Sequence, residues 1–155
     1  MLAGVSTLGV QLGYGVETVA STKPSSFKLL DRINAIGEVS LTPEKIDASA
    51  LEDLATRYVA GRSDTGGNFD VTVNFTGEVE EQWSTLIAAY NALDEGKRMW
   101  FEVYVPSMSK ACFVVAQPPQ KLPLSAIDQN GLLTVTISLA LEEYVGWETA
   151  IQPTV

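Results

Sequence analysis

The sequence predicts an α+β, mainly β fold: a small antiparallel β-sandwich or barrel with one flanking helix, an extended N-terminal arm and a long inter-strand loop. Two segments, 68–75 and 132–141, alternate apolar and polar residues, which is typical of strands with one buried face. A third segment, 78–95, carries apolar residues at helical spacing. Several strands with short connections and a single helix favour an antiparallel sheet that the helix covers.

The N-terminal region has no sustained periodicity. Four glycines in its first fifteen residues interrupt short apolar pieces, and residues 21–26 have the composition of a linker. We therefore expect an extended arm over residues 1–28, followed by one β domain over 29–155. In that domain, the loose alternation of residues 30–41 predicts a strand that is partly covered on both faces.

A long polar connection follows, over residues 42–67. Compact domains join strands with a handful of residues, and structureless connections above about 12–15 residues are uncommon unless they bind something or stay disordered. We therefore expect this loop to contact something outside its own fold. Ser49 and Glu52 form a capping box ahead of apolar residues, so local rules predict a short helix over 50–58. The alternative is a loop extended along a neighbouring subunit.

The middle of the chain gives the clearest strand and the helix. In segment 68–75 one face is apolar, and the other carries Asp70, Thr72 and Asn74. In segment 78–95 the apolar stripe includes Trp83, and acidic residues occupy the first turn, where the helix dipole favours anions. We expect this helix to pack on the sheet.

The C-terminal third predicts a hairpin and one more strand. Residues 100–105 alternate, and a turn over 106–110 joins them to an apolar run over 111–116. Segment 132–141 then alternates strictly and is followed by a short acidic and aromatic tail over 142–155. Trp100, Glu102 and Tyr104 share one strand face. We interpret this face as a contact with a partner subunit, with a sugar-binding platform as the alternative.

Composition argues against several functions. The 155 residues include 19 acidic and 10 basic side chains, a formal charge of −9 that repels a phosphate backbone, so we expect no stable DNA binding. No targeting signal and no apolar run of membrane-spanning length is evident, and we expect no membrane association. The chain has no histidine, the commonest general base and transition-metal ligand, and Cys112 is its sole cysteine.

The remaining chemical motifs are weak. Asp64, Asn68 and Asp70 lie among glycines, but their spacing lacks the order of a calcium loop, so we interpret them as a turn into a strand. Glu80 and Glu81 face different directions on a helix, which favours a dipole effect over a catalytic pair. The Gly13-Tyr14-Gly15 sequence lacks the rest of a nucleotide-binding loop, and we interpret it as part of a flexible arm. We predict that the protein is not an enzyme and has no cofactor or metal.

Short pieces spread over nearly the whole chain form one pattern. In order, they are Gly9-Val10-Gln11-Leu12, Ile36-Gly37-Glu38, Ile46-Asp47, Leu51, Tyr58 to Gly61, Asp64, the strand 68–75, Leu86 to Gly96, Phe101 to Val105, and Asn130-Gly131 before a T-V-T-I strand. In this order and spacing, the pieces resemble the major tail tube protein of long-tailed, siphovirus-like bacteriophages. The pattern is diffuse and has no invariant signature.

This resemblance implies a structural virion protein that self-assembles into stacked hexameric rings. The stack forms the tail tube, a conduit for ejection of viral DNA, assembled in the host cytoplasm. The partners it implies are other copies of the chain, the tape-measure and tail-terminating proteins of the same virion, and double-stranded DNA in transient, non-specific passage. The alternatives are the inner tube of a contractile tail or secretion-like device, and a β-sandwich carbohydrate- or receptor-binding module that would use Trp100, Tyr104 and Trp147.

Two sets of residues follow as hypotheses from this resemblance. Contacts between subunits are expected at Ile46, Asp47, Leu51, Leu54, Tyr58 and Asp64. The polar strand faces are expected to line the channel through Asp70, Thr72, Asn74, Thr134, Thr136 and Ser138. A wall without lysine or arginine rows offers phosphates no counter-charge, so it would let a duplex pass without being held.

Overall fold

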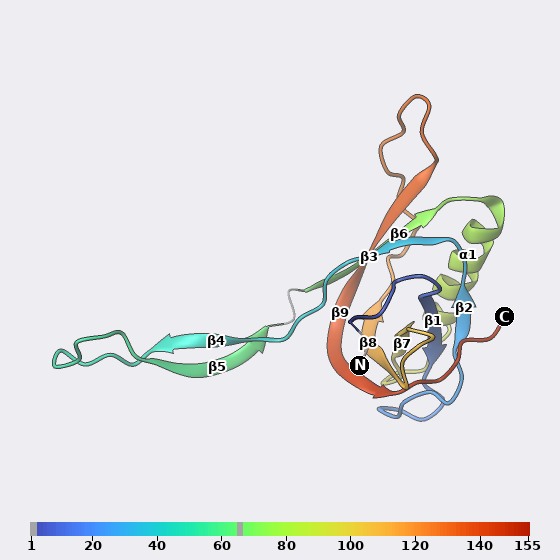
Figure 1. Ribbon diagram of the computed structural model, residues 1–155. Helices are drawn as coiled ribbons and strands as arrows, with labels where there is room; N and C mark the ends of the chain where they lie inside the picture. The colour runs from blue at the N-terminus through green and yellow to red at the C-terminus, as the bar shows by residue number, and fades with distance from the viewer. Residues whose placement is uncertain (1–2, 65–66) are drawn as a thin grey trace.

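The computed structural model describes residues 3–64 and 67–155, and for residues 42–44 and 61–64 it describes the backbone alone. The described residues form nine strands and one helix (Figure 1). In chain order these are β1 (Gln11–Val16), β2 (Lys28–Leu30), β3 (Ile33–Ile36), β4 (Thr42–Asp47), β5 (Tyr58–Asp64), β6 (Asn68–Asn74), α1 (Gly77–Asn91), β7 (Met99–Tyr104), β8 (Lys110–Gln117) and β9 (Thr134–Thr149).

Seven strands form one antiparallel sheet in the order β2-β1-β7-β8-β9-β6-β3, and β4 pairs with β5 in a separate ribbon. The two edge strands, β2 and β3, are consecutive in the chain and are joined by Asp31 and Arg32 alone. Two extended residues span only about 7 Å, so the edges of the sheet must approach each other. The sheet therefore curves into a partly open barrel, which confirms the predicted fold class.

The main core lies between the sheet and α1. Trp83 and Leu86 of the helix are fully buried with Phe69 of β6 and Phe101 of β7, whose rings lie 6.3 Å apart. Thr76 caps the helix by accepting a hydrogen bond from the Val79 amide at 3.3 Å. The sequence predictions of this helix, of the strand at 68–75 and of the β7–β8 hairpin are confirmed.

A second apolar cluster lies on the other face of β7 and β8, where Trp100 and Phe113 pack against Phe27. Glu102 is also fully buried there, and its Oε2 accepts a hydrogen bond from the Ile151 amide at 2.9 Å. The interpretation of the Trp100, Glu102 and Tyr104 face as a partner contact or a sugar platform is therefore wrong. The chain covers this face itself, with the segment after β1 and with the residues after β9.

Part of the predicted N-terminal arm belongs to the sheet. β1 pairs with both β2 and β7, and its central residues are buried on both faces. The sequence of β1 shows no apolar–polar alternation because two of its residues are glycines. Gly13 and Gly15 leave space that other segments of the chain fill. A Cβ atom at Gly15 would lie 2.8 Å from the Ser26 carbonyl oxygen, and one at Gly13 would lie 3.1 Å from Pro153. The flexible arm predicted at Gly13-Tyr14-Gly15 is therefore wrong.

The predicted C-terminal tail also begins too early. β9 continues to Thr149 and pairs with β8 through two register shifts, one of them next to Gly146, which has φ +99. These irregularities interrupt the alternation after Leu141, which hid the second half of the strand. The chain then crosses to β2, where the Thr154 carbonyl accepts a hydrogen bond from the Leu29 amide at 2.8 Å.

Candidate functional site

The six polar residues predicted to face a channel lie together on one sheet face. The register of β6 and β9 places Asp70 opposite Ser138, Thr72 opposite Thr136, and Asn74 opposite Thr134. We call these three cross-strand pairs the polar ladder. All six side chains are exposed or half-buried.

Hydrogen bonds across the strands connect the polar ladder. Ser138 Oγ donates to Asp70 Oδ1 at 2.7 Å, and the hydroxyls of Thr72 and Thr136 lie 3.0 Å apart. Asn34 of β3 donates its amide to Asn74 Oδ1 at 2.9 Å, which extends the polar surface to the next strand. The surface contains a single carboxylate and no cation, so it is polar and weakly acidic.

The orientation of the polar ladder is fixed by the opposite face of the same strands. Side chains alternate along a strand, so a one-residue slip would move every apolar residue into water. The inward residues are all at most 1% exposed: Phe69, Val71, Val73, Val135, Ile137 and Leu139. The ladder therefore has to face outward in the isolated chain.

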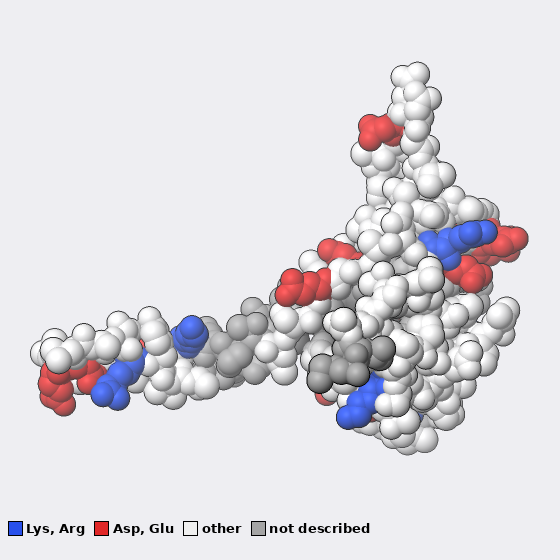
Figure 2. Space-filling model, viewed as in Figure 1, with Lys and Arg blue, Asp and Glu red and all other residues white. Residues whose placement is uncertain are grey.

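The long connection is a β-ribbon that projects from the body of the domain (Figures 1 and 2). Its β4 and β5 strands are joined by residues 48–57 at the tip, and we call this whole element the arm. Ile46 and Val59 face each other on one side and are 53% and 54% exposed. On the other side, Lys45 lies over the ring of Tyr58, with its Nζ 5.7 Å from the centroid.

The tip of the arm is a hydrogen-bonded loop instead of the predicted helix over 50–58. Ser49 Oγ accepts a hydrogen bond from the Arg57 amide across the loop at 2.8 Å, so it does not cap a helix. Asp53 accepts from the Ala50 amide at 2.8 Å and pairs with Arg57 Nε at 2.9 Å. The backbone amide and the hydroxyl of Ser49 lower the pKa of Asp47 at the end of β4. The helix prediction is wrong because these polar groups bond across the loop.

The tip also carries two leucines without any contact that shields them. Leu51 and Leu54 are 108% and 106% exposed, as in an extended chain. Of the six residues predicted at subunit contacts, Ile46, Asp47, Leu51, Leu54 and Tyr58 all lie exposed on the arm. The side chain of Asp64 lies outside the described residues. Val59 shares the exposed face of Ile46. The sequence did not predict it as a subunit contact, although it predicted the adjacent Tyr58.

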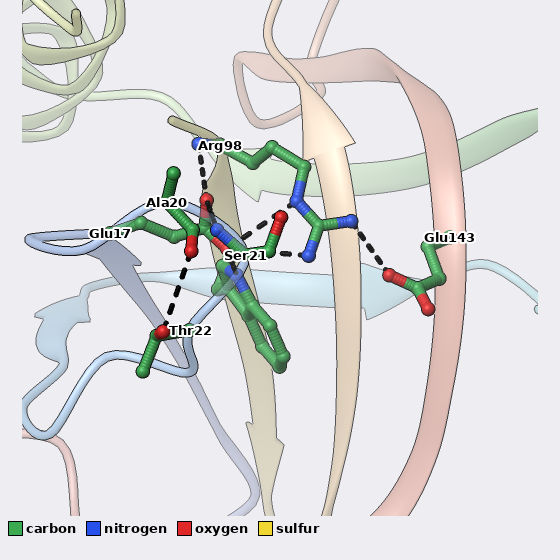
Figure 3. Close-up of polar contacts among 7 residues, drawn as sticks. Glu17, Ala20, Ser21, Thr22, Arg98 and Glu143 are labelled. Carbon is green, nitrogen blue, oxygen red and sulfur yellow. Dashed lines mark hydrogen bonds and ion pairs between the residues drawn. The ribbon is translucent and has the colours of Figure 1, made fainter. Parts of the chain in front are cut away.

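An ion pair joins the buried Glu17 to the partly exposed Arg98 beside Trp100 (Figure 3). Glu17 Oε2 accepts hydrogen bonds from Trp100 Nε1 at 2.9 Å and from Arg98 Nη2 at 3.3 Å, and its Oε1 accepts the Arg98 amide at 2.8 Å. Arg98 also donates to Glu143 of β9 at 2.7 Å. Burial would raise the pKa of Glu17, but these donors outweigh burial and hold the pKa below its ordinary value. Both carboxylate oxygens of Glu17 accept hydrogen bonds from the protein itself, so we interpret this cluster as structural.

Other kinds of site have little support in the described residues. They contain no group of three or more histidine, cysteine or acidic side chains arranged to hold a metal ion. In the same part of the chain, no helix has both the length and the apolar character needed to cross a membrane. Trp100 is buried and Tyr104 is half-buried, so they do not form an aromatic platform with Trp147. The polar ladder and the arm remain as the two candidate surfaces.

Comparison with known proteins finds similarity at the level of the fold. No family model and no curated protein matches the sequence. A chain from the tail of an empty GTA particle, determined with helical refinement and C6 symmetry, matches with a TM-score of 0.56 and 12% identity, over 92% of this chain and 96% of that one. A chain from the six-fold symmetrised baseplate of the anti-feeding prophage matches with a TM-score of 0.57 and 10% identity, over 92% and 95%. The chain therefore has a fold found in tail proteins of phage-like particles.

Proposed function

We propose that this chain is the tube subunit of a phage-like tail, a structural and non-enzymatic protein that assembles into stacked hexameric rings enclosing a channel for double-stranded DNA. The observation that carries the proposal is the arm. It extends away from the domain, and in the described part of the chain β4 and β5 pair only with each other. The similar chains come from particles with six-fold symmetry, which supports other copies of this chain as the partner.

An arm of this kind is unfavourable in an isolated protein. A two-stranded ribbon alone is marginally stable in water, because neither of its faces is buried. Exposed apolar side chains at its tip gain nothing in the monomer, whereas full burial of one leucine contributes about 1.5–3 kcal/mol. Leu51 and Leu54 are therefore best explained as contacts made after assembly. This is the role that the tail-tube resemblance assigns to the long loop.

The polar ladder suits the wall of a DNA channel. Protein side chains that hold DNA are mainly lysine and arginine, which neutralise phosphates and release counterions. The ladder offers Asp70, hydroxyls and an amide, and the whole chain carries a charge of −9. Such a wall stays hydrated and attracts no phosphate. We propose that the ladder lines the channel and that the duplex passes it without being held.

The second candidate is the inner tube, or a baseplate part of it, in a contractile tail or secretion-like device. The similarity to a chain from the anti-feeding prophage baseplate favours it as much as the GTA tail favours the first candidate. Both candidates require the same ring assembly. They differ in the partner outside the tube, so a sheath-protein gene beside the gene for this chain would select the contractile device.

The test compares assembly of the wild-type protein with an arm variant, Leu51→Asp with Leu54→Asp. Negative-stain electron microscopy of the purified wild type should show tubes of constant diameter. The aspartate variant should form no tubes at the same concentration, because each lost leucine contact weakens association by about ten- to a hundredfold. Leu51→Met with Leu54→Met keeps the tip apolar and serves as the matched control.

The loss of tubes is informative only if the aspartate variant is folded. Both leucines are exposed, so we expect its circular dichroism and thermal midpoint to equal those of the wild type. A wild-type protein that stays monomeric at high concentration would contradict the proposed function. Normal tubes from the aspartate variant would show instead that the arm is not the connector.

A further inference from the structure

A second projection leaves the domain between β8 and β9 (Figure 1). It comprises residues 118–133, and we call it the β8–β9 loop. Four of its exposed side chains are large and apolar: Leu124 is 76% exposed, Ile127 67%, Leu132 79% and Leu133 42%. Asp128 is the only charged residue between positions 122 and 133, and Figure 2 shows this projection as white apart from one acidic group.

The base of this loop is fixed to the sheet. The Leu133 carbonyl accepts a hydrogen bond from the Phe75 amide at 2.8 Å, and Ser125 Oγ accepts one from the Thr136 amide at 3.0 Å. Leu122 packs against the main core. Asn130, with a φ of 64, forms the turn that the Asn-Gly sequence predicts. The loop is thus held in place while its apolar side chains point into solvent.

The arm and the β8–β9 loop lie at opposite ends of the same strand pair. The chain returns from the arm at Asn68, which is opposite Ala140, and the loop enters β9 at Thr134, which is opposite Asn74. Seven strand residues at about 3.3 Å each separate these ends by roughly 20 Å. If the ladder between them lines a channel, the two projections lie toward opposite faces of a ring, because channel-lining strands cross the wall at a tilt.

We propose that the β8–β9 loop is the docking surface for the arm tip of a second copy of this chain in the adjacent ring. The inference rests on the proposed tube function and adds the contact that stacks the rings. Different surfaces at opposite ends of one subunit make a head-to-tail contact, which propagates without closing. A contact of each surface with itself would give a closed dimer instead.

The two surfaces match in chemistry. Leu51 and Leu54 of the tip are fully exposed, and Leu124, Ile127 and Leu132 of the loop are each at least two-thirds exposed. Apolar patches on a soluble chain are removed from water when they meet each other. The tip segment 48–57 carries three charged residues, Glu52, Asp53 and Arg57, and the loop tip carries Asp128. Arg57 is the only cation in the tip segment 48–57, and it remains largely exposed beside its partner Asp53.

The first test adds the variant Leu124→Asp with Ile127→Asp to the assembly experiment. These side chains are exposed, so the thermal midpoint should not change. The loop variant and the arm-tip variant disrupt two halves of one contact, and we expect both to stop at the same smaller species in analytical ultracentrifugation. The control is Leu124→Met with Ile127→Met, which should form tubes.

The second test detects the contact directly. In a Cys112→Ser background, the pair Leu54→Cys and Ile127→Cys is treated with a short bismaleimide after tubes have formed. A head-to-tail contact joins each subunit to two others, so denaturing gels should show a ladder of multimers, whereas each single-cysteine variant should give no species above a dimer.

The outcomes separate this inference from the proposed function. Tubes formed normally by the aspartate loop variant, or a cysteine pair that gives no multimer ladder in intact tubes, would overturn the docking inference and leave the tube function standing. Failure of the wild type to form tubes would overturn the tube function itself.

Discussion

The chain contains two antiparallel ribbons, β6–β9 and β4–β5, that differ in what covers them. In the β6–β9 ribbon, every inward residue of the paired segment is buried under the helix and the rest of the sheet, and only the outward face, which holds the polar ladder, meets water. In the arm, the side chains that the structure describes are exposed on both faces and at the tip, apart from the half-buried Asp53. Strand pairing alone therefore does not stabilise a ribbon. The stability of the isolated chain lies in the first ribbon, and we propose that the second becomes favourable through contacts with another molecule.

Substitution of one buried residue in the first ribbon is the strongest test of this comparison. Ile137 is fully buried and lies opposite Val71. Ile137→Ala removes buried carbon atoms and leaves a cavity, so we expect it to lower the free energy of unfolding by about 2–5 kcal/mol. Urea titration followed by circular dichroism measures the loss.

The matched control lies at an equivalent strand position in the arm. Val59 pairs with Ile46 and is half exposed, so Val59→Ala should change the free energy of unfolding by less than about 0.5 kcal/mol. Similar losses of stability in the two monomeric alanine variants would contradict the claim that the β6–β9 ribbon stabilises the isolated chain and the arm does not.

Two buried carboxylates give the next largest effect. Glu17 has a pKa below its ordinary value near 4.5, because hydrogen bonds from Trp100, Arg98 and Ser21 outweigh the opposing effect of burial. Its contribution to stability is therefore present above pH 4.5 and lost as the pH falls through the folded-state pKa. Glu17→Gln should cost about 1–3 kcal/mol at pH 7, since it weakens hydrogen bonds to a charged group. The difference from the wild type should shrink on acidification.

Glu102 is the contrasting case. Burial raises its pKa, against the opposing effects of the Ile151 amide and of Lys23. Above pH 4.5 the folded state then holds the proton more tightly than the unfolded state does, so stability falls as the pH rises through the raised pKa. Glu102→Gln removes this penalty and should be neutral or stabilising at pH 7. Thermal melts of both variants from pH 3 to 8 should give differences of opposite sign, and equal signs would contradict this assignment.

Sequence reasoning succeeded where a local pattern and the tertiary environment agree. Strict alternation located β6 and the first half of β9, including the six residues that form the polar ladder. Sequence reasoning failed where the identity of a residue is determined by its contact with a segment that is distant in the sequence. Gly13 and Gly15 have no side chains to show a period, and they are in the sheet because Pro153 and Ser26 approach them.

The prediction of a helix at the arm tip was wrong for a related reason. Ser49 and Glu52 satisfy the rule for a helix start, but Ser49 bonds to Arg57 and the carboxylate that folds back is that of Asp53. Arg57 lies eight residues after Ser49, beyond the first turn to which a local rule for a helix start applies. The exposure of Leu51 and Leu54 could not be predicted either, because it depends on the distance between the arm and the domain.

The polar ladder gives the smallest expected effect on stability and the sharpest test of its role. Thr72→Lys with Thr136→Lys removes a hydroxyl pair and places like charges opposite each other on an exposed face, so we expect a loss on the order of 1 kcal/mol or less. The inward face is untouched, and tubes should form as in the wild type. Each subunit would then offer two cations to passing phosphates, so assembled tubes should retain duplex DNA at low salt and release it as the salt concentration rises. Thr72→Ser with Thr136→Ser keeps the hydroxyls and should not retain DNA. Lysine tubes of normal appearance that release the duplex as readily as the serine tubes would mean that the ladder faces away from the channel, and the first ribbon would then be exposed on that side for contact with a neighbour.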